Sequence, residues 1–216
     1  MEKYRILAHR GWWLTAKEKN SLIALNRAIE HGFGIETDFR DYNGKLVISH
    51  DPVGWGNEQF VDVKDWLNQL PIEYGYIGVN VKSDGLSSLI SDLFEQYNIQ
   101  RFFVFDMSVP ETIRYASVKV PYFVRQSEME KEPIVEPIGL SIANGIWLDS
   151  FTDDNWYDTE LVTNWLDKGF YVSLVSPELH GREHQNIWKK ILHSGVYKHP
   201  RFMICTDLPM DAMNYF

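Results

Sequence analysis

The sequence predicts one α/β domain, spanning residues 1–216, folded as a (β/α)8 barrel. Short β-rich runs alternate with helical patterns about eight times along the 216 residues. This alternation calls for parallel strands joined by right-handed crossovers. An open doubly wound sheet has the same local pattern. The barrel is favoured because most strands end in ionisable residues, which a barrel gathers at the carboxyl ends of its strands.

Eight strands are expected, with a small hairpin extension after the second. Asn43-Gly44 is typical of a tight hairpin turn, so a short strand should return beside the second one. The expected strands are residues 5–8, 34–40 with the returning strand 45–49, 76–81, 102–105, 122–125, 145–148, 171–175 and 202–205.

Four segments between these strands have apolar residues three or four positions apart, the spacing of an amphipathic helix. They cover residues 21–31, 86–96, 160–166 and 185–192. Gly32, Gly169 and Gly195 follow three of them, where a left-handed helix cap is expected. Residues 126–139 contain four glutamates, one lysine and two prolines, and we expect a long surface loop there.

Composition limits the classes of function. The net charge of −9 argues against non-specific binding of nucleic acid or anionic lipid, so a phosphate-bearing ligand would need local positive charge. No apolar run reaches the length of a transmembrane helix, and the first residues do not resemble a signal peptide. With one cysteine, Cys205, which we expect to be a buried structural thiol, a cytoplasmic location is expected.

Glu36 and Asp38 lie two positions apart on an expected strand, so both side chains leave the same face. Paired carboxylates repel each other unless a cation or a proton lies between them. Oxygen ligands favour a hard divalent cation, Mg²⁺ or Ca²⁺. The alternative is a solvated pair, or one paired with Arg40.

His9-Arg10-Gly11 ends the first strand, and His50 ends the returning strand of the hairpin. Histidine exchanges protons near neutral pH, and an arginine fork fits a phosphate. Gly11 would allow a close approach of the backbone to a ligand. Taken alone, His9 is as compatible with a structural ion pair, and His50 with an ordinary surface position.

Several motifs together resemble the glycerophosphodiester phosphodiesterase family. They are Ala8-His-Arg-Gly11, Asn20-Ser-Leu-Ile-Ala24, Gly34-Ile-Glu-Thr-Asp38, Asn43-Gly-Lys-Leu-Val-Ile-Ser-His-Asp-Pro52 and Ile204-Cys-Thr-Asp-Leu-Pro209. The resemblance implies a TIM barrel that cleaves a glycerol- or sugar-linked phosphodiester with the help of one divalent cation.

The resemblance also implies roles for individual residues. The histidines matching His9 and His50 act as general acid and base. The arginine and lysine matching Arg10 and Lys82 contact the phosphate, and the acids matching Glu36 and Asp38 hold the metal. The substrate's own neighbouring hydroxyl would attack phosphorus and give a cyclic phosphate, which water then opens.

The chain departs from the family pattern at two positions. Asn80 stands where the family usually has a third acidic ligand; it can bind metal through its carbonyl oxygen, and Asp106 or Glu178 could compensate for the missing charge. Lys19 replaces a glutamate before Asn20. Two alternatives therefore stay open: an impaired barrel that binds a phosphorylated ligand, and a lyase that stops at the cyclic phosphate.

Other residues are weaker candidates. Trp12, with Trp13 and Trp55, would form an apolar wall for the substrate or pack a helix against the barrel. Glu178 is a candidate substrate ligand. His180 and His184, four residues apart, could bind zinc on a helix, although Gly181 indicates a loop. The substrate alcohol and the oligomeric state cannot be inferred from the sequence.

Overall fold

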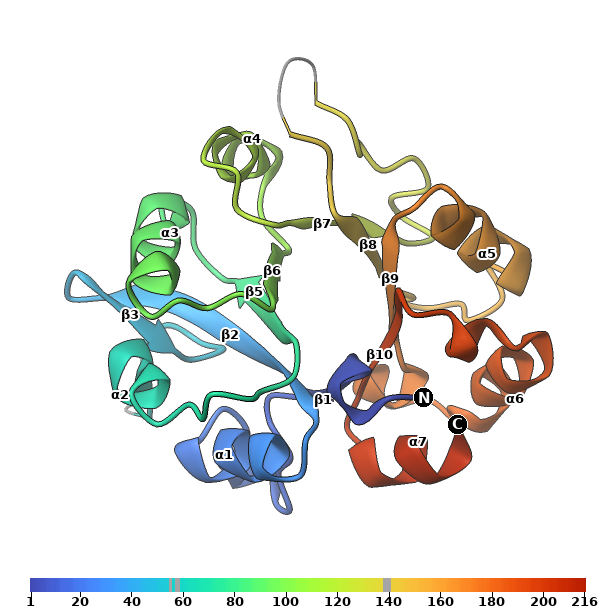
Figure 1. The fold of residues 1–216 in the computed structure, drawn as a ribbon, viewed down its shortest axis with the longest axis horizontal. Helices are drawn as coiled ribbons and strands as arrows, with labels where there is room; N and C mark the ends of the chain where they lie inside the picture. The colour runs from blue at the N-terminus through green and yellow to red at the C-terminus, as the bar shows by residue number, and fades with distance from the viewer. Residues whose placement is uncertain (55, 57–58, 138–140) are drawn as a thin grey trace.

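The computed structural model describes residues 1–54, 56, 59–137 and 141–216, and a ring of parallel strands forms its centre (Figure 1). These residues form ten strands, two of which are antiparallel additions to the ring: β3 (Lys45–Ile48) pairs with β2, and β4 (Val61–Asp62) pairs with β3. The other eight are β1 (Ile6–His9), β2 (Gly34–Tyr42), β5 (Ile77–Val81), β6 (Phe102–Phe105), β7 (Phe123–Gln126), β8 (Gly145–Leu148), β9 (Tyr171–Val175) and β10 (Phe202–Thr206).

The eight strands follow one another around the ring in the order β6, β5, β2, β1, β10, β9, β8, β7. β6 is joined to the start of β7 by a parallel bridge between Val104 and Tyr122. The Val104 amide donates a hydrogen bond to the carbonyl oxygen of Pro121 at 2.9 Å. These contacts close the ring, so the predicted barrel is confirmed and the open sheet is wrong.

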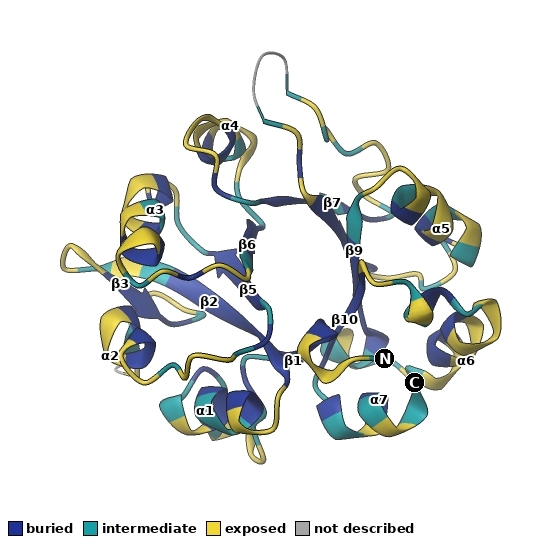
Figure 2. Ribbon diagram, in the orientation of Figure 1, coloured by how far each residue is buried: buried dark blue, intermediate teal, exposed yellow. Residues whose placement is uncertain are grey.

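Helices surround the ring, each with a buried inner face and an exposed outer face (Figures 1 and 2). They are α1 (Leu22–Glu30), α2 (Val63–Leu67), α3 (Ser87–Gln96), α4 (Val109–Ser117), α5 (Thr159–Asp167), α6 (Gln185–Ser194) and α7 (Pro209–Tyr215), with short 3-10 helices η1 (Lys3–Arg5), η2 (Ala16–Glu18), η3 (Pro177–His180) and η4 (Val196–Lys198). None of the helices in the described ranges has the length and apolar character needed to cross a bilayer. The cytoplasmic location stays a prediction.

The four helices expected from the sequence are confirmed as α1, α3, α5 and α6, whereas α2, α4 and α7 were not predicted. Gly32, Gly169 and Gly195 all have positive φ, as expected of residues that end helices. The loop expected at 126–139 has neither helix nor strand after β7 up to residue 137; its last residue, Gly139, lies outside the described residues.

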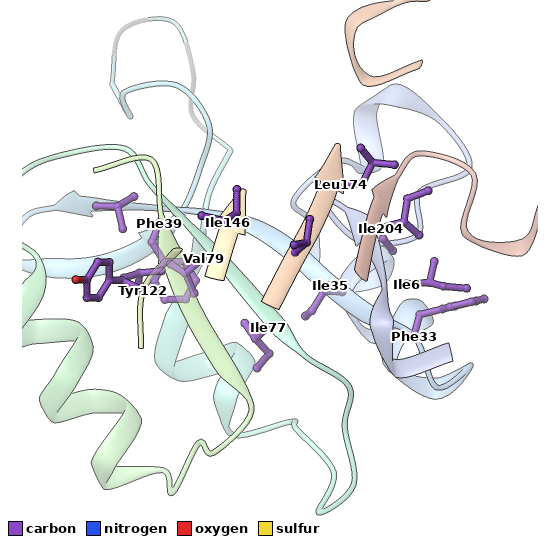
Figure 3. Close-up of a cluster of buried hydrophobic side chains, with 14 of the residues drawn as sticks. Ile6, Phe33, Ile35, Phe39, Ile77, Val79, Tyr122, Ile146, Leu174 and Ile204 are labelled. Carbon is purple, nitrogen blue, oxygen red and sulfur yellow. The ribbon is translucent and has the colours of Figure 1, made fainter. Parts of the chain in front are cut away.

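Side chains alternate along each strand between two cores. One set fills the barrel interior: Leu7, Phe103, Phe105, Phe123, Trp147, Val175, Met203 and Cys205. The other set packs between the strands and the surrounding helices, and includes Ile35, Ile77 and Val79 (Figure 3). Because Ile35 and Phe39 belong to the outer core, Glu36 and Asp38 point into the barrel.

The hairpin after β2 brings His50 to the carboxyl ends of the strands. Asn43 and Gly44 have φ of 50° and 75°, which a type I′ turn requires. β3 then pairs antiparallel with β2, and the Ser49 amide donates to the carbonyl oxygen of Asp38 at 3.0 Å. His50 follows directly, so the turn brings it back close to Asp38 although the two residues are well separated in the sequence.

Candidate active site

The carboxyl ends of three adjacent strands bring most of the predicted site residues together. β2 pairs with β1 on one side and with β5 on the other. His9 is in register with Glu36, and Asp38 is in register with Asn80. Neighbours in register on parallel strands point to the same face. The residues so gathered are His9, Arg10, Glu36, Asp38, Asn80 and Lys82.

The two carboxylates of the predicted metal site are almost fully buried, with exposed fractions of 2% for Glu36 and 1% for Asp38. Burial, together with the negative charge of Asp38, raises the pKa of Glu36 to about 8. Burial also acts against ionisation of Asp38, but Lys82 and Arg10 hold the pKa of this carboxyl below its ordinary value. Without a cation, the pair therefore keeps one proton at neutral pH.

Asp38 is surrounded by donors. Its carboxylate lies 3.2 Å from Arg10 Nε and 3.2 Å from Lys82 Nζ, and it accepts a 2.7 Å hydrogen bond from Asn20 Nδ2. The alternative pairing with Arg40 is not what the structure shows, because Arg40 donates to the carbonyl oxygen of His50 at 2.9 Å. The positively charged side chains of Arg10 and Lys82 around this one carboxylate leave a local positive charge that suits a phosphate.

His9 is held in one orientation by Asp207, a strand-end residue for which no role was predicted. The two side chains meet through His9 Nδ1 at 2.6 Å. An ionised carboxylate only accepts hydrogen bonds, so a neutral His9 carries its proton on Nδ1. Nε2, which lies 3.9 Å from Glu36, is then a free acceptor. Burial lowers the pKa of His9, which favours this neutral form.

The turn after β1 aims Arg10 at the acid pair. Arg10 and Asn20 both have positive φ, at 57° and 60°, which non-glycine residues rarely adopt. The Arg10 amide donates to Glu36 at 3.2 Å, and its carbonyl oxygen accepts from the Asn20 amide at 2.9 Å. Backbone strain at these two positions thus places the guanidinium over Asp38.

The structure shows a reason for a glycine at position 11 that the sequence did not predict. The φ of Gly11 is 81°, and a Cβ added there would lie 2.6 Å from the backbone carbon of Ala24. This glycine therefore permits a close approach to the first turn of α1. An approach of a ligand to Gly11 stays a prediction.

His50 lies at the edge of the site, with 42% of its side chain exposed. Its Nδ1 is 2.9 Å from Asp51. It lines a cavity of about 590 Å³ whose other walls include Arg10, Lys19 and Asn20. His50 and the phosphate-binding candidate Arg10 thus face one space, beside the buried acid pair.

Asn80 presents an oxygen to the site. Its side chain is 9% exposed, its Nδ2 donates to Asp106 at 3.1 Å, and its Oδ1 is buried without a hydrogen-bond partner. In the described parts of the chain, no three His, Cys, Asp or Glu side chains form a metal-binding cluster. Asn80 would supply a third oxygen instead, and an all-oxygen set of this kind would fit a hard divalent cation.

The structure separates the two neighbouring tryptophans. The ring of Trp12 packs edge-on against Phe33, 5.8 Å between centroids, within the outer core. This position favours the packing alternative for Trp12. Trp13 donates from Nε1 to the carbonyl oxygen of His9 at 3.1 Å, and Lys19 Nζ lies 4.4 Å above its ring. Trp13 is therefore the one beside the site, while Trp55 lies outside the described residues.

Glu178 and His180 lie in η3, directly after β9. Glu178 accepts hydrogen bonds from Ser176, from Thr206 and, at 3.2 Å, from the Asp207 amide, so it braces β9 against β10. A substrate contact for Glu178 stays a prediction. His180 bonds to Asp149 at 2.8 Å.

The ring of His184 instead packs at a tilt against Trp188 in α6, 4.3 Å between ring centroids. The two histidines of the His180–His184 segment therefore have separate partners. This arrangement does not support the zinc site considered from the sequence.

Three solved structures are similar to this chain over nearly its whole length. A glycerophosphodiester phosphodiesterase from Agrobacterium tumefaciens str. C58 matches with a TM-score of 0.67 and 16% identity, over 97% of this chain and 98% of that chain. A glycerophosphoryl diester phosphodiesterase from Parabacteroides distasonis ATCC 8503 matches with a TM-score of 0.68 and 11% identity, over 97% and 85%. An Oleispira antarctica phosphodiesterase, solved in complex with the product sn-glycerol-3-phosphate, matches with a TM-score of 0.57 and 13% identity, over 98% and 96%.

No protein-family model matches the sequence, and no curated protein matches it significantly. At 11–16% identity the structural likeness establishes the fold. The carboxyl ends of its strands carry a buried acid pair, two positively charged side chains and an oriented histidine. The chain has the barrel fold found in glycerophosphodiester phosphodiesterase structures.

Proposed function

We propose that the protein is a metal-dependent phosphodiesterase that acts on a small glycerol- or sugar-linked phosphodiester. The observation that carries the proposal is the buried Glu36–Asp38 pair, with Arg10 and Lys82 beside it and the oriented His9 next to it. Burial of so many ionisable groups is unfavourable unless they serve a site. The fold of the three solved phosphodiesterases adds support.

Charge at the site suits the phosphodiester group. Arg10 offers a planar fork of donors, and Lys82 offers a compact point charge. Both lie within 3.2 Å of the same carboxylate, so they are held in place before the substrate arrives. Donors fixed in advance stabilise charge that develops on the non-bridging oxygens at low reorganisation cost.

The two histidines divide the proton transfers. His9 is neutral with a free Nε2, so it takes the proton from the attacking hydroxyl. His50, paired with Asp51 at the cavity edge, donates a proton to the leaving oxygen. A neighbouring hydroxyl of the substrate is the nucleophile, and it forms a cyclic phosphate that water then opens.

The divalent cation, Mg²⁺ or Ca²⁺, would be held by Glu36, Asp38 and Asn80. When bound it neutralises phosphate charge and acts as a Lewis acid. Its presence also removes the reason for Glu36 to stay protonated, because a positive charge replaces the proton between the two acids.

Turnover assays on glycerophosphocholine and glycerophosphoethanolamine, with phosphorus NMR of the products, test the proposal. His9→Ala and His50→Ala should each lower turnover at least about a hundredfold while the protein stays folded. His193→Ala, an exposed histidine in α6, serves as the matched control. Full activity in excess EDTA would disprove the metal role, and accumulation of cyclic phosphate would make the enzyme a lyase.

One observation favours a second function, a barrel that only binds a phosphorylated ligand. Asn80 gives the site one negative charge fewer than an acid would, and Asp38 is already neutralised by Arg10 and Lys82. Calorimetry that finds tight phosphodiester binding, with no turnover under any divalent cation, would favour the binder.

A further inference from the structure

The side-chain amide of Asn80 has two chemically opposite ends, and only one of them can bind a cation. The oxygen can be a ligand, whereas the NH₂ group would repel a metal ion. Asn80 Oδ1 is the buried end without a hydrogen-bond partner, and Asn80 Nδ2 is the end that donates to Asp106 at 3.1 Å. The function of Asn80 therefore depends on what selects this orientation of the amide.

Asp106 provides that selection. Burial raises the pKa of this carboxyl, but the contact with the Arg125 guanidinium favours its ionised form, and an ionised carboxylate only accepts hydrogen bonds. One of its oxygens, Oδ2, accepts from Asn80. The other, Oδ1, contacts the guanidinium of Arg125, whose carbon lies 5.1 Å from the ring centroid of Phe151. Asp106 thus lies between the Arg125 guanidinium and the Asn80 amide, and one of its two carboxylate oxygens faces each of them.

We propose that Asp106 is a positioning residue that turns the carbonyl oxygen of Asn80 toward the acid pair and so completes the oxygen ligands for the divalent cation. This inference rests on the metal site of the proposed function. Asp38 and Asn80 are in register on adjacent strands, so an oxygen on Asn80 faces the same space as the Asp38 carboxylate. Residues that orient metal ligands typically change metal affinity 10–100-fold when substituted.

The variant Asp106→Asn tests this mechanism sharply. Arg125 would keep its contact with the oxygen of the new amide, so the NH₂ group of that amide would face Asn80. Two NH₂ groups cannot pair, so the Asn80 amide would turn over and direct its NH₂ group at the acid pair. The backbone at this position has φ of 67°, which asparagine tolerates as well as aspartate does. The substitution therefore adds no backbone strain.

Calorimetry with Ca²⁺ or Mg²⁺ alone, on the full chain without substrate, gives the readout. Asp106→Asn should weaken binding about 10–100-fold. Asn80→Ala should also weaken it, and adding Asp106→Asn to Asn80→Ala should cause no further loss. Asp149→Asn, the same change at another buried strand-end aspartate, whose partner is His180, is the matched control and should leave affinity within about threefold.

The exchange variant Asn80→Asp with Asp106→Asn separates positioning from a structural role. It restores a donor facing an acceptor between the two residues and turns a carboxylate oxygen toward the acid pair, so affinity should return at least to the wild-type value.

Asp106→Asn that binds the cations as tightly as wild type, or an exchange variant that is folded but fails to recover, would overturn the role of Asp106 alone. A wild type that binds neither cation would overturn the metal part of the proposed function as well.

Discussion

Glu36 makes the metal-free protein less stable than it would be without a carboxyl group at this position. The side chain is buried, and its pKa of about 8 lies well above its ordinary value of 4.5. Glu36→Gln removes this ionisable group but keeps an oxygen that can accept the Arg10 amide hydrogen bond. We therefore expect the variant, in EDTA, to be more stable than the wild type at neutral and alkaline pH.

The sign and size follow from proton linkage. The unfolded chain releases the Glu36 proton near pH 4.5, whereas the folded chain keeps it until about pH 8. Between these values the folded state binds more protons, so the free energy of unfolding falls as pH rises, and the loss is complete above pH 8. Each pKa unit corresponds to about 1.4 kcal/mol, so about 3 kcal/mol is an upper bound at pH 7. For a chain of this size, this corresponds to a rise in Tm of up to about 10 °C.

Thermal unfolding of both proteins in EDTA between pH 4 and 9 measures the effect. The difference in Tm should be near zero below pH 4.5 and should grow to pH 8. Glu111→Gln, at a glutamate in α4 that is also 2% exposed, is the matched control. Saturating Ca²⁺ should reverse the order, since the wild type, with a carboxylate at this position, binds the cation more tightly and gains more stability from it. A difference that is constant with pH, or a less stable variant at pH 8, would refute this account of Glu36.

Three further predictions concern the support of the site. Asp207→Asn should lower turnover at least about a hundredfold without loss of Tm, because an amide donor would move the His9 proton to Nε2; a wild-type rate would contradict this role. Gly11→Ala should cost about 1–3 kcal/mol in denaturant unfolding, since its Cβ would meet the backbone of α1. Asn20→Ala should cost about 1–3 kcal/mol, because it removes one donor from the buried Asp38 and leaves the Thr37 hydroxyl without its acceptor; unchanged stability would argue against this network.

The strands could be predicted closely because they are buried on both faces. Such strands are continuous apolar runs, and the ionisable residue that follows each run marks its end. β6, β8 and β9 have the predicted bounds, and β1, β5, β7 and β10 differ by one residue at one or both ends. The closed ring could be inferred for the same reason, since only closure brings all those polar ends to one place.

Helices were missed where their apolar pattern was short, although their first turns contained a signal. α4 begins after Ser108, whose side chain accepts from the Glu111 amide at 3.3 Å, and Pro110 lies in the first turn. A serine followed three residues later by glutamate is a capping box, and proline is favoured at that point. Start signals would have found α4, as Pro209 would have found α7, where the periodicity did not.

The sequence predicted the site residues that lie at the ends of strands. It did not predict the features in which one side chain determines the proton position or the orientation of another. Strand alternation places Glu36 and Asp38 together, because position along a strand fixes direction. It cannot give the His9 tautomer, which depends on Asp207 from the opposite end of the chain. It also cannot say which end of the Asn80 amide faces the acids. These choices depend on hydrogen bonds between distant strands, and they decide whether the same residues form a site for a cation and a base or a neutral cluster.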